Sequence, residues 1–423
     1  MSKLFSKINY SLPLIHRYVV TVLPIAIVTG PFLADLFCII SSMLFIYFSF
    51  LKKEFHYYYQ KLFILFIAWC VYLIITSILS NDPLFSLESS LFHFRFGLFA
   101  LSILYIFNND SKISKYMTIC FVSLFIFILI DGYYQYITGF NLFGFEYSHQ
   151  YGRLSGIFGD KWIIGNFLSR TFPIIFALLI MNFKYSRKVA LLMIFILITT
   201  DILIFLSGER SAFISLLLGS ILIIILSNKW KRFRAFSLIF SLLVIILISI
   251  SNNNIKNRMI DHTINQTNIF GSNYIPDHEL LFKSAYYMFL DSPIIGNGTK
   301  MFRKLCGDEK YYFEYEAYNS CSTHPHNTYF QLLAETGLLG TIPVILVLSF
   351  IFYLFLRHFF MKVYSIKPYL SDVQICLYVG IVISLWPLNT HMNFFGNWLN
   401  VIYFLPIGIL LHTYNINRSN INN

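Results

Sequence analysis

The chain has 423 residues, of which 57% are hydrophobic and only 12% are charged, whereas about 25% of a typical soluble chain is charged. A soluble protein of this length could not bury so much apolar surface. The composition therefore excludes a disordered chain, a nucleic-acid-binding domain and an ordinary cytosolic enzyme. The net charge of +11 lies in short basic clusters between apolar runs of about 20 residues, the length that spans a bilayer.

Twelve apolar runs predict an all-α polytopic membrane protein, because irregular backbone cannot face lipid. In chain order they are 14–30, 32–51, 62–80, 91–107, 116–136, 163–183, 189–207, 211–228, 235–251, 337–356, 372–388 and 398–413. Only Gly30-Pro31 separates the first two runs. Because no small-residue cleavage site precedes the second run, we interpret the N-terminal region as an anchor rather than a cleavable signal peptide.

Basic residues predict the orientation of these helices, since Lys and Arg concentrate in cytoplasmic connections. If the N-terminus is cytoplasmic, the residues on that side are Lys3, Lys7, Lys52, Lys53, Lys61, Lys112, Lys115, Lys184, Arg187, Lys188, Lys229, Lys231, Arg232, Arg234, Arg357, Lys362, Lys367 and Arg418. The short turns predicted on the opposite side, 81–90, 208–210 and 389–397, contain a single basic residue, Arg210. The pattern therefore predicts an even number of spans with both termini in the cytoplasm.

Two long outer segments divide the chain. We expect residues 1–251 to hold the first nine helices with an outer loop at 137–162. Residues 252–336 form a large outer loop, and residues 337–423 hold three more helices and a cytoplasmic tail. Within the large loop, Leu281, Ala285, Met288 and Phe289 have helical spacing, which predicts an amphipathic helix on the outer membrane surface.

The densest group of polar residues is Cys321–Gln331, where the large loop re-enters the membrane. His324 and His326 flank a proline, and a histidine here can act as a general base near neutral pH. Asn327 and Gln331 could bind sugar hydroxyls. Alternatively, the histidines cap the next helix. Zinc binding would need a third ligand, and none lies at a recognisable spacing, so we expect no metal.

Arg210 lies in the tight turn Ser207–Ala212 between two very apolar runs. A guanidinium there suits bidentate binding of phosphate oxygens. It could instead snorkel to the membrane surface or pair with Glu209.

Three more arginines are candidates for an outer site. Arg153 lies in the glycine-rich segment Gly152–Asp160, where backbone can approach a ligand closely. It is either a second phosphate contact or a solvated loop residue. Arg95 and Arg170 are predicted near outer helix ends, where they either serve function or snorkel.

Two of the six cysteines, Cys306 and Cys321, bracket fourteen residues of the large outer loop, and the other four fall in apolar runs. In an oxidising compartment the pair is a plausible disulfide; otherwise both are free thiols. No nucleotide-binding glycine pattern occurs in the chain. We therefore expect no cofactor and an energy source within the substrate.

These motifs, in this order, resemble the O-antigen ligase and polymerase superfamily of bacterial membrane glycosyltransferases over roughly residues 60–410. The most specific segments are Gly152–Asp160, Ser207–Ala212, Asp291–Gly298 and His324–Gly337. The resemblance implies a GT-C-like fold of the lipid-sugar-dependent type, with a large periplasmic loop and no metal. It also implies residence in the bacterial inner membrane, with the active site on the periplasmic side.

Members of the superfamily take a glycan from undecaprenyl pyrophosphate. Ligases pass it to lipid A-core in lipopolysaccharide assembly, polymerases to another lipid-linked repeat unit, and some relatives to protein. We favour a metal-independent, inverting ligase, with a repeat-unit polymerase or a protein O-oligosaccharyltransferase as the alternative. A transporter of lipid-linked sugars, the second alternative, would need charged residues at mid-membrane, where Asp131 and Asp201 are the main candidates.

The resemblance also implies residue roles. Arg210 matches the arginine expected to hold the pyrophosphate. His326 matches the histidine proposed as the base or as the group that orients the acceptor. Many members carry an arginine at the head of the amphipathic helix, where this chain has His278. The resemblance therefore does not identify the second residue that binds the pyrophosphate. Besides His278, the candidates are Arg258, Lys283 and Arg303.

Overall fold

The computed structural model describes residues 2–148, 152–183, 187–261, 263–264, 278–315 and 318–422. The protein is mostly helical, and its main helices are α1 (Ser2–Thr29), α2 (Pro31–Leu51), α3 (Lys61–Ile78), α4 (Pro83–Ser90), α5 (Arg95–Asn109), α6 (Ile113–Thr138), α7 (Ile164–Asn182), α8 (Arg187–Leu206), α9 (Arg210–Leu226), α10 (Lys231–Ser251), α13 (Glu279–Asp291), α15 (Thr328–Val363), α16 (Asp372–Ser384) and α17 (Asn397–Asn422). Short helices are η1 (Phe55–Tyr59), η2 (Gly156–Phe158), α11 (Asn253–Lys256), η3 (Asn257–Asp261) and α14 (Phe302–Leu305). Within the described ranges, strand appears only in the antiparallel pair β1 (Glu314–Tyr315) and β2 (Tyr318–Asn319).

Eight stretches of helix in the described residues are long and apolar enough to cross a membrane: Ser11–Thr29, Pro31–Leu51, Lys61–Ile78, Pro83–Asn109, Ile113–Thr138, Ile164–Asn182, Lys231–Ser251 and Thr328–Val363. Ala190–Leu206, Arg210–Leu226 and Asp372–Ser384 are shorter apolar helices. The chain is thus a multi-pass membrane protein. Each of the twelve predicted runs coincides with a helix, and the number of crossings stays a prediction.

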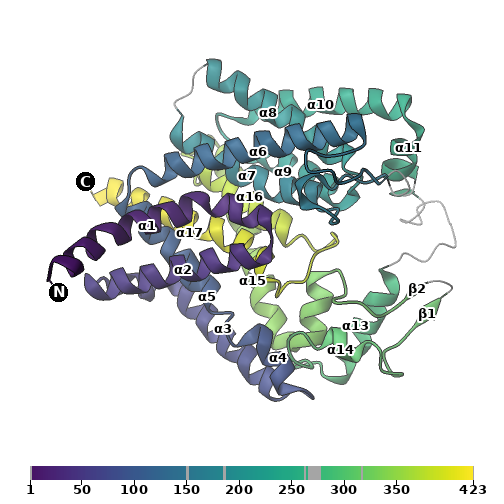
Figure 1. Cartoon of the computed structure of the whole chain (residues 1–423), viewed down its shortest axis with the longest axis horizontal. Helices are drawn as coiled ribbons and strands as arrows, with labels where there is room; N and C mark the ends of the chain where they lie inside the picture. Colours follow the sequence, from purple (N-terminus) through teal and green to yellow (C-terminus); the bar gives the residue numbers. More distant parts are fainter. Residues whose placement is uncertain are drawn as a thin grey trace.

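Helices α1, α2, α6 and α10 run in about the same direction across the view, and α3 runs obliquely to them (Figure 1). Both termini lie at the left end of the view, and α11, α13 and β1–β2 lie at the opposite end (Figure 1). Helix α7 is the most enclosed of the eight long spans, since 83% of the residues in its most apolar stretch are buried. It packs against α6, α9 and α16. A polar side chain on α7 is therefore held inside protein rather than in lipid.

Glycine breaks two helices at the predicted boundaries. Gly30, with φ 128°, separates α1 from α2, and Pro31 begins α2. Gly337, with φ 61°, kinks α15 at the point where the apolar run begins. A Cβ on Gly337 would lie 2.4 Å from the Ile294 carbonyl oxygen, so only glycine fits. The first part of α15 therefore packs with the large loop, through residues 294–296, and the rest belongs to the bundle.

Two predicted boundaries are wrong. The predicted turn 81–90 contains helix α4, because the Asp82 side chain accepts from the Phe85 N–H and Pro83 supplies a favourable first helical residue. Arg234, predicted in a basic connection, lies inside α10 and is fully buried. It makes a bidentate ion pair with Asp201 at 2.8 and 2.9 Å, and this pair stabilises its charge inside the bundle.

The two carboxylates that a transporter would use are both engaged. Asp201 pairs with Arg234 and also accepts from Ser241. Asp131 accepts from the Leu142 N–H at 2.9 Å and thereby anchors the base of the first outer loop. Both carboxylates therefore bond to groups of the protein itself, as residues that stabilise the fold do.

Helix α13 matches the predicted amphipathic helix. Its apolar residues Leu281, Ala285 and Met288 form a small core with Phe302 of α14 and Ala334 of α15. This apolar face therefore covers the outer part of α15 rather than lying free.

Candidate functional site

The connection between α16 and α17, residues 385–396, holds the segment that contains the two histidines. The His391 N–H donates to the His326 carbonyl at 2.7 Å, and the His324 ring Nε2 lies 3.1 Å from the His391 carbonyl. Asn327 donates to the carbonyls of Pro387 and Asn389. This connection, which takes in most of the predicted short turn 389–397 and the last residues of the predicted run 372–388, fixes the position of His326.

Three histidine rings meet at this point. The ring centroids of His324 and His326 are 4.2 Å apart, and those of His278 and His326 are 4.9 Å apart. Burial, with smaller contributions from the neighbouring histidines, lowers the pKa of His326 to about 3. Burial also lowers the pKa of His324 to about 4. His326 is therefore neutral at pH 7 and can accept a proton.

The backbone of His326 has φ 57°, in the left-handed region that residues other than glycine seldom adopt. Asn327 follows as the N-cap of α15, and its Oδ1 accepts from the N–H groups of Tyr329 and Phe330. The structure thus holds His326 in an uncommon conformation between the outer loop and α15. Such strain often accompanies functional sites.

Asn327 and Gln331 use their amide groups within the protein. Besides its bonds to Pro387 and Asn389, Asn327 caps α15. Gln331 donates to Asn393 at 2.7 Å and accepts from the Phe394 N–H at 2.9 Å. We interpret both residues as positioning groups that attach α15 to residues 385–396.

A second group forms around the turn between α8 and α9. The Arg258 Nε donates to the Gly208 carbonyl at 3.2 Å, and the Leu154 N–H donates to the Ser207 carbonyl at 3.3 Å. A Cβ on Gly208 would lie 2.1 Å from the Gly152 carbonyl oxygen and 3.3 Å from the Arg153 Cγ. The turn and the loop 137–162 therefore lie so close together that only glycine fits at position 208. Three arginines thus surround one turn, Arg153, Arg210 and Arg258, and each is partly exposed.

Glu209 organises this turn from beneath. Its carboxylate accepts from the Gly165 N–H at 2.6 Å and from the backbone and side chain of Asn166, where α7 begins. Burial raises the pKa of Glu209 to about 7, against the opposing effect of these hydrogen bonds and of Arg153. Glu209 therefore joins the arginine-bearing turn to the central helix.

Residues 385–396 also join the two groups. Asn389, whose carbonyl accepts from Asn327, donates its amide to the Ser211 carbonyl at 3.2 Å and to the Ser215 Oγ. Ser211 directly follows Arg210. The connection therefore bonds both to the start of α9, next to Arg210, and to the segment that contains His326.

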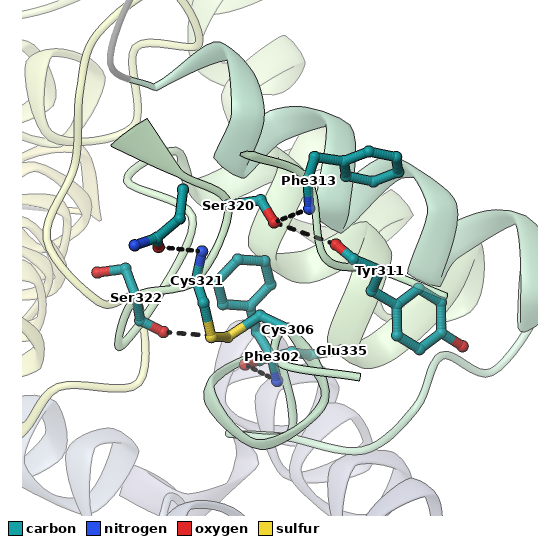
Figure 2. The surroundings of a disulfide bond; sticks show 9 residues. Phe302, Cys306, Tyr311, Phe313, Ser320, Cys321, Ser322 and Glu335 are labelled. Carbon is teal, nitrogen blue, oxygen red and sulfur yellow. Dashed lines mark hydrogen bonds between the residues drawn. A yellow bond between two sulfur atoms is a disulfide. The ribbon is translucent and has the colours of Figure 1, made fainter. Parts of the chain in front are cut away.

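Cys306 and Cys321 form a disulfide that joins the end of α14 to the segment entering His324 (Figure 2). Nearby, the Phe302 N–H donates to the buried Glu335 of α15, and Ser320 bonds to the backbone of Tyr311 and Phe313 (Figure 2). The disulfide thus fixes the chain just before His324, and the bond from Phe302 to Glu335 attaches the same loop to α15.

The remaining candidates lie in different surroundings. Arg95 makes a bidentate ion pair with Asp35 of α2 at 2.8 and 3.2 Å, which neutralises its charge. Lys283 lies over the Phe313 ring. Arg303 lies close enough to His324 for its charge to contribute to the lowered pKa of that histidine. Arg153 also stacks on Trp162, with 5.5 Å from its guanidinium carbon to the ring centroid.

Sequence reasoning missed residues 385–396. The signal was present as four polar side chains, Asn389, Thr390, His391 and Asn393, within an otherwise apolar region. Their role was hidden because the partners of Asn389, His391 and Asn393 lie about 60 to 180 residues earlier in the chain.

Residues 191–345 match the family model of the O-antigen ligases. This segment belongs to the O-antigen ligase family. It runs from α8 through the Arg210 turn and the disulfide to His326 and α15. It therefore contains Arg210, Arg258 and the three clustered histidines, while Arg153 and residues 385–396 lie outside it. No curated protein matches the chain.

Proposed function

We propose that the protein is a glycosyltransferase of the O-antigen ligase type. It moves a glycan from undecaprenyl pyrophosphate to lipid A-core at the periplasmic face of the bacterial inner membrane. The observation that carries the proposal is the attachment of His326 and the Arg210 turn to one segment, residues 385–396, within and beside the matched domain. A cationic cluster beside a neutral histidine fits a donor with an anionic leaving group and a hydroxyl acceptor.

Arg210, Arg153 and Arg258 would bind the pyrophosphate. The transfer leaves negative charge on the departing diphosphate, and fixed guanidinium groups stabilise that charge in a site shielded from water. Arg258 fills the role of second clamp better than His278, because its guanidinium contacts the turn itself at Gly208.

His326 would take the proton from the acceptor hydroxyl as that oxygen attacks the anomeric carbon. Direct displacement of the diphosphate would invert the configuration. The pKa of His326 is low in the protein alone. A bound diphosphate would raise it towards neutrality, because a nearby negative charge favours the imidazolium form. His324 and His278 pack on the ring and orient it.

The experiment is a deletion in the native host, followed by analysis of glycans on the lipid carrier and on lipid A. Long polymer left on the carrier beside bare lipid A-core would support a ligase. Single repeat units on both would indicate a polymerase instead. No change in either would contradict the proposal and point to transfer to protein or to another polysaccharide.

Complementation assigns the chemistry to residues. We expect His326→Ala and Arg210→Ala to reduce transfer by at least about 100-fold, as expected when a general base or a charge-stabilising group is removed. His56→Ala, at an exposed position in η1, serves as the matched control and should restore wild-type glycans. Full activity of either site variant, at equal membrane levels, would remove the proposed site.

A further inference from the structure

Arg170 is an arginine buried in the central helix α7, with 1% of its surface exposed. The described residues give none of its three guanidinium nitrogens a hydrogen-bond partner. They also contain no carboxylate within ion-pair distance of it. A buried guanidinium without a compensating acceptor is strongly unfavourable.

Arg234 shows how this protein treats a buried arginine that serves structure alone. It is equally buried, yet it donates to both oxygens of Asp201 and to Ser220 and Ser237. The contrast indicates that the donors of Arg170 serve a group from outside the chain.

His391 is the neighbour of Arg170 on the side of the histidine cluster. It is 2% exposed, and neither ring nitrogen has a hydrogen-bond partner in the described part of the protein. Burial, followed by the charge of Arg170, lowers the pKa of His391 to about 3. The backbone of His391 bonds to His326 and to the ring of His324, and the charges of Arg170 and His324 both act on the His391 ring.

Arg170 lies further along α7 from the α8–α9 turn than Gly165 does. The first turn of α7 packs on the α8–α9 turn, since a Cβ on Gly165 would lie 2.4 Å from the Ser207 Oγ and 3.2 Å from the Ala212 Cβ. Arg170 follows five residues later, about 7.5 Å further along the helix. A ligand that reaches both arginines must therefore extend from this turn along α7 into the bundle.

We propose that Arg170 and His391 form a buried anion subsite that binds the phosphoryl group attached to the isoprenoid of the lipid donor. The inference rests on the proposed function, in which Arg153, Arg210 and Arg258 bind the pyrophosphate, and it assigns the sugar-linked phosphoryl group to these three arginines. The guanidinium donates two parallel N–H groups to phosphate oxygens, and His391, neutral, donates one more. The two subsites divide the diphosphate along the direction in which the lipid enters.

The test uses the full chain in lipid nanodiscs, titrated calorimetrically with farnesyl monophosphate and farnesyl diphosphate. The monophosphate carries only the lipid-linked phosphoryl group. We expect Arg170→Gln to weaken its binding at least tenfold, the effect of losing charge-assisted hydrogen bonds, and Arg210→Gln to change it less than twofold. Both variants should weaken diphosphate binding at least tenfold. Arg357→Gln, at an exposed position over Tyr369, is the matched control and should bind both lipids normally.

His391→Gln provides a second variant in case Arg170→Gln does not fold. It keeps the backbone bonds to His324 and His326 and should weaken monophosphate binding about threefold or more. If folded Arg170→Gln and His391→Gln bind both lipids as the wild type does, the subsite is overturned and the proposed function stands. If Arg210→Gln reduces monophosphate binding as much as Arg170→Gln, the division into two subsites is overturned. Absence of diphosphate binding by the wild type would overturn both proposals.

Discussion

Glu209 shows how one buried side chain fixes the candidate site. It lies next to Arg210, and its carboxylate caps the start of α7 through Gly165 and Asn166. Any change in its charge or hydrogen bonds therefore alters the relation between the turn and the central helix. The same carboxylate offsets part of the positive charge around the turn, which lowers the repulsion among the arginines before the donor binds.

The raised pKa of Glu209 gives a pH dependence with a defined sign. Because the pKa of Glu209 is about 7 in the folded protein and that of an ordinary glutamate is 4.5, the folded state binds the proton more tightly. The contribution of this group to stability is therefore full below about pH 4.5 and is lost as the pH rises to 7, by about 3 kcal/mol at most. Glu209→Gln removes this titration.

Thermal unfolding in detergent between pH 5 and pH 8 checks this expectation. The Tm of the wild type minus that of Glu209→Gln should fall by a few degrees as the pH rises through 7. Glu309→Gln, which changes an exposed carboxylate of the outer loop, should keep the wild-type pH dependence. A constant difference between wild type and Glu209→Gln would show that Glu209 does not titrate in this range.

At the scale of elements, the outer lobe is a small unit joined to the bundle through α15. Helices α13 and α14 share a core with the first part of α15, and the disulfide closes the chain between Cys306 and Cys321. Cys321 precedes His324 by three residues, so the disulfide restrains the path of the chain into the site.

Removal of the disulfide should loosen this lobe without unfolding the bundle. The two cysteines are 15 residues apart, for which loop-closure entropy predicts a stabilisation of about 3 kcal/mol. We expect the double variant Cys306→Ser, Cys321→Ser to be cut by protease between residues 307 and 320 at least tenfold faster than the wild type. Transfer should fall several-fold. Cys120→Ser, which changes a free thiol in α6, should leave both properties unchanged, and equal protease resistance of the double variant would contradict the prediction.

Hydrophobic runs were sufficient to predict the positions of the long helices, including the boundaries at Gly30 and Gly337, because the bilayer imposes length and apolarity on each span. The spacing of apolar residues was likewise sufficient to predict helix α13. The same reasoning could not reveal the burial of Arg234 and Arg170, since burial depends on which helices surround a residue. It also could not assign residues 385–396, whose polar side chains acquire a role only through contacts with His326, Gln331 and Ser211.

At the scale of the whole molecule, the fold separates two ends. Both termini lie at one end of the bundle, and α11, α13 and the strand pair lie at the other (Figure 1). A lipid-linked donor can reach the candidate site only if the second end faces the compartment where the glycan is displayed. The distribution of basic residues predicts that the end with the termini is cytoplasmic.

This orientation can be tested with single cysteines and a membrane-impermeant maleimide applied to intact cells whose outer membrane has been permeabilised. Phe143→Cys, at a 63% exposed position after α6, should be labelled, because the predicted topology places it in the periplasm. Lys367→Cys, at an exposed position between α15 and α16, should be labelled only after the inner membrane is opened. The wild type, whose free thiols all lie on helices α2, α3, α6 and α16, provides the background signal. Labelling of Lys367→Cys alone in intact cells would reverse the orientation, and would place the arginine turn and His326 in the cytoplasm, where the proposed transfer to lipid A-core could not occur.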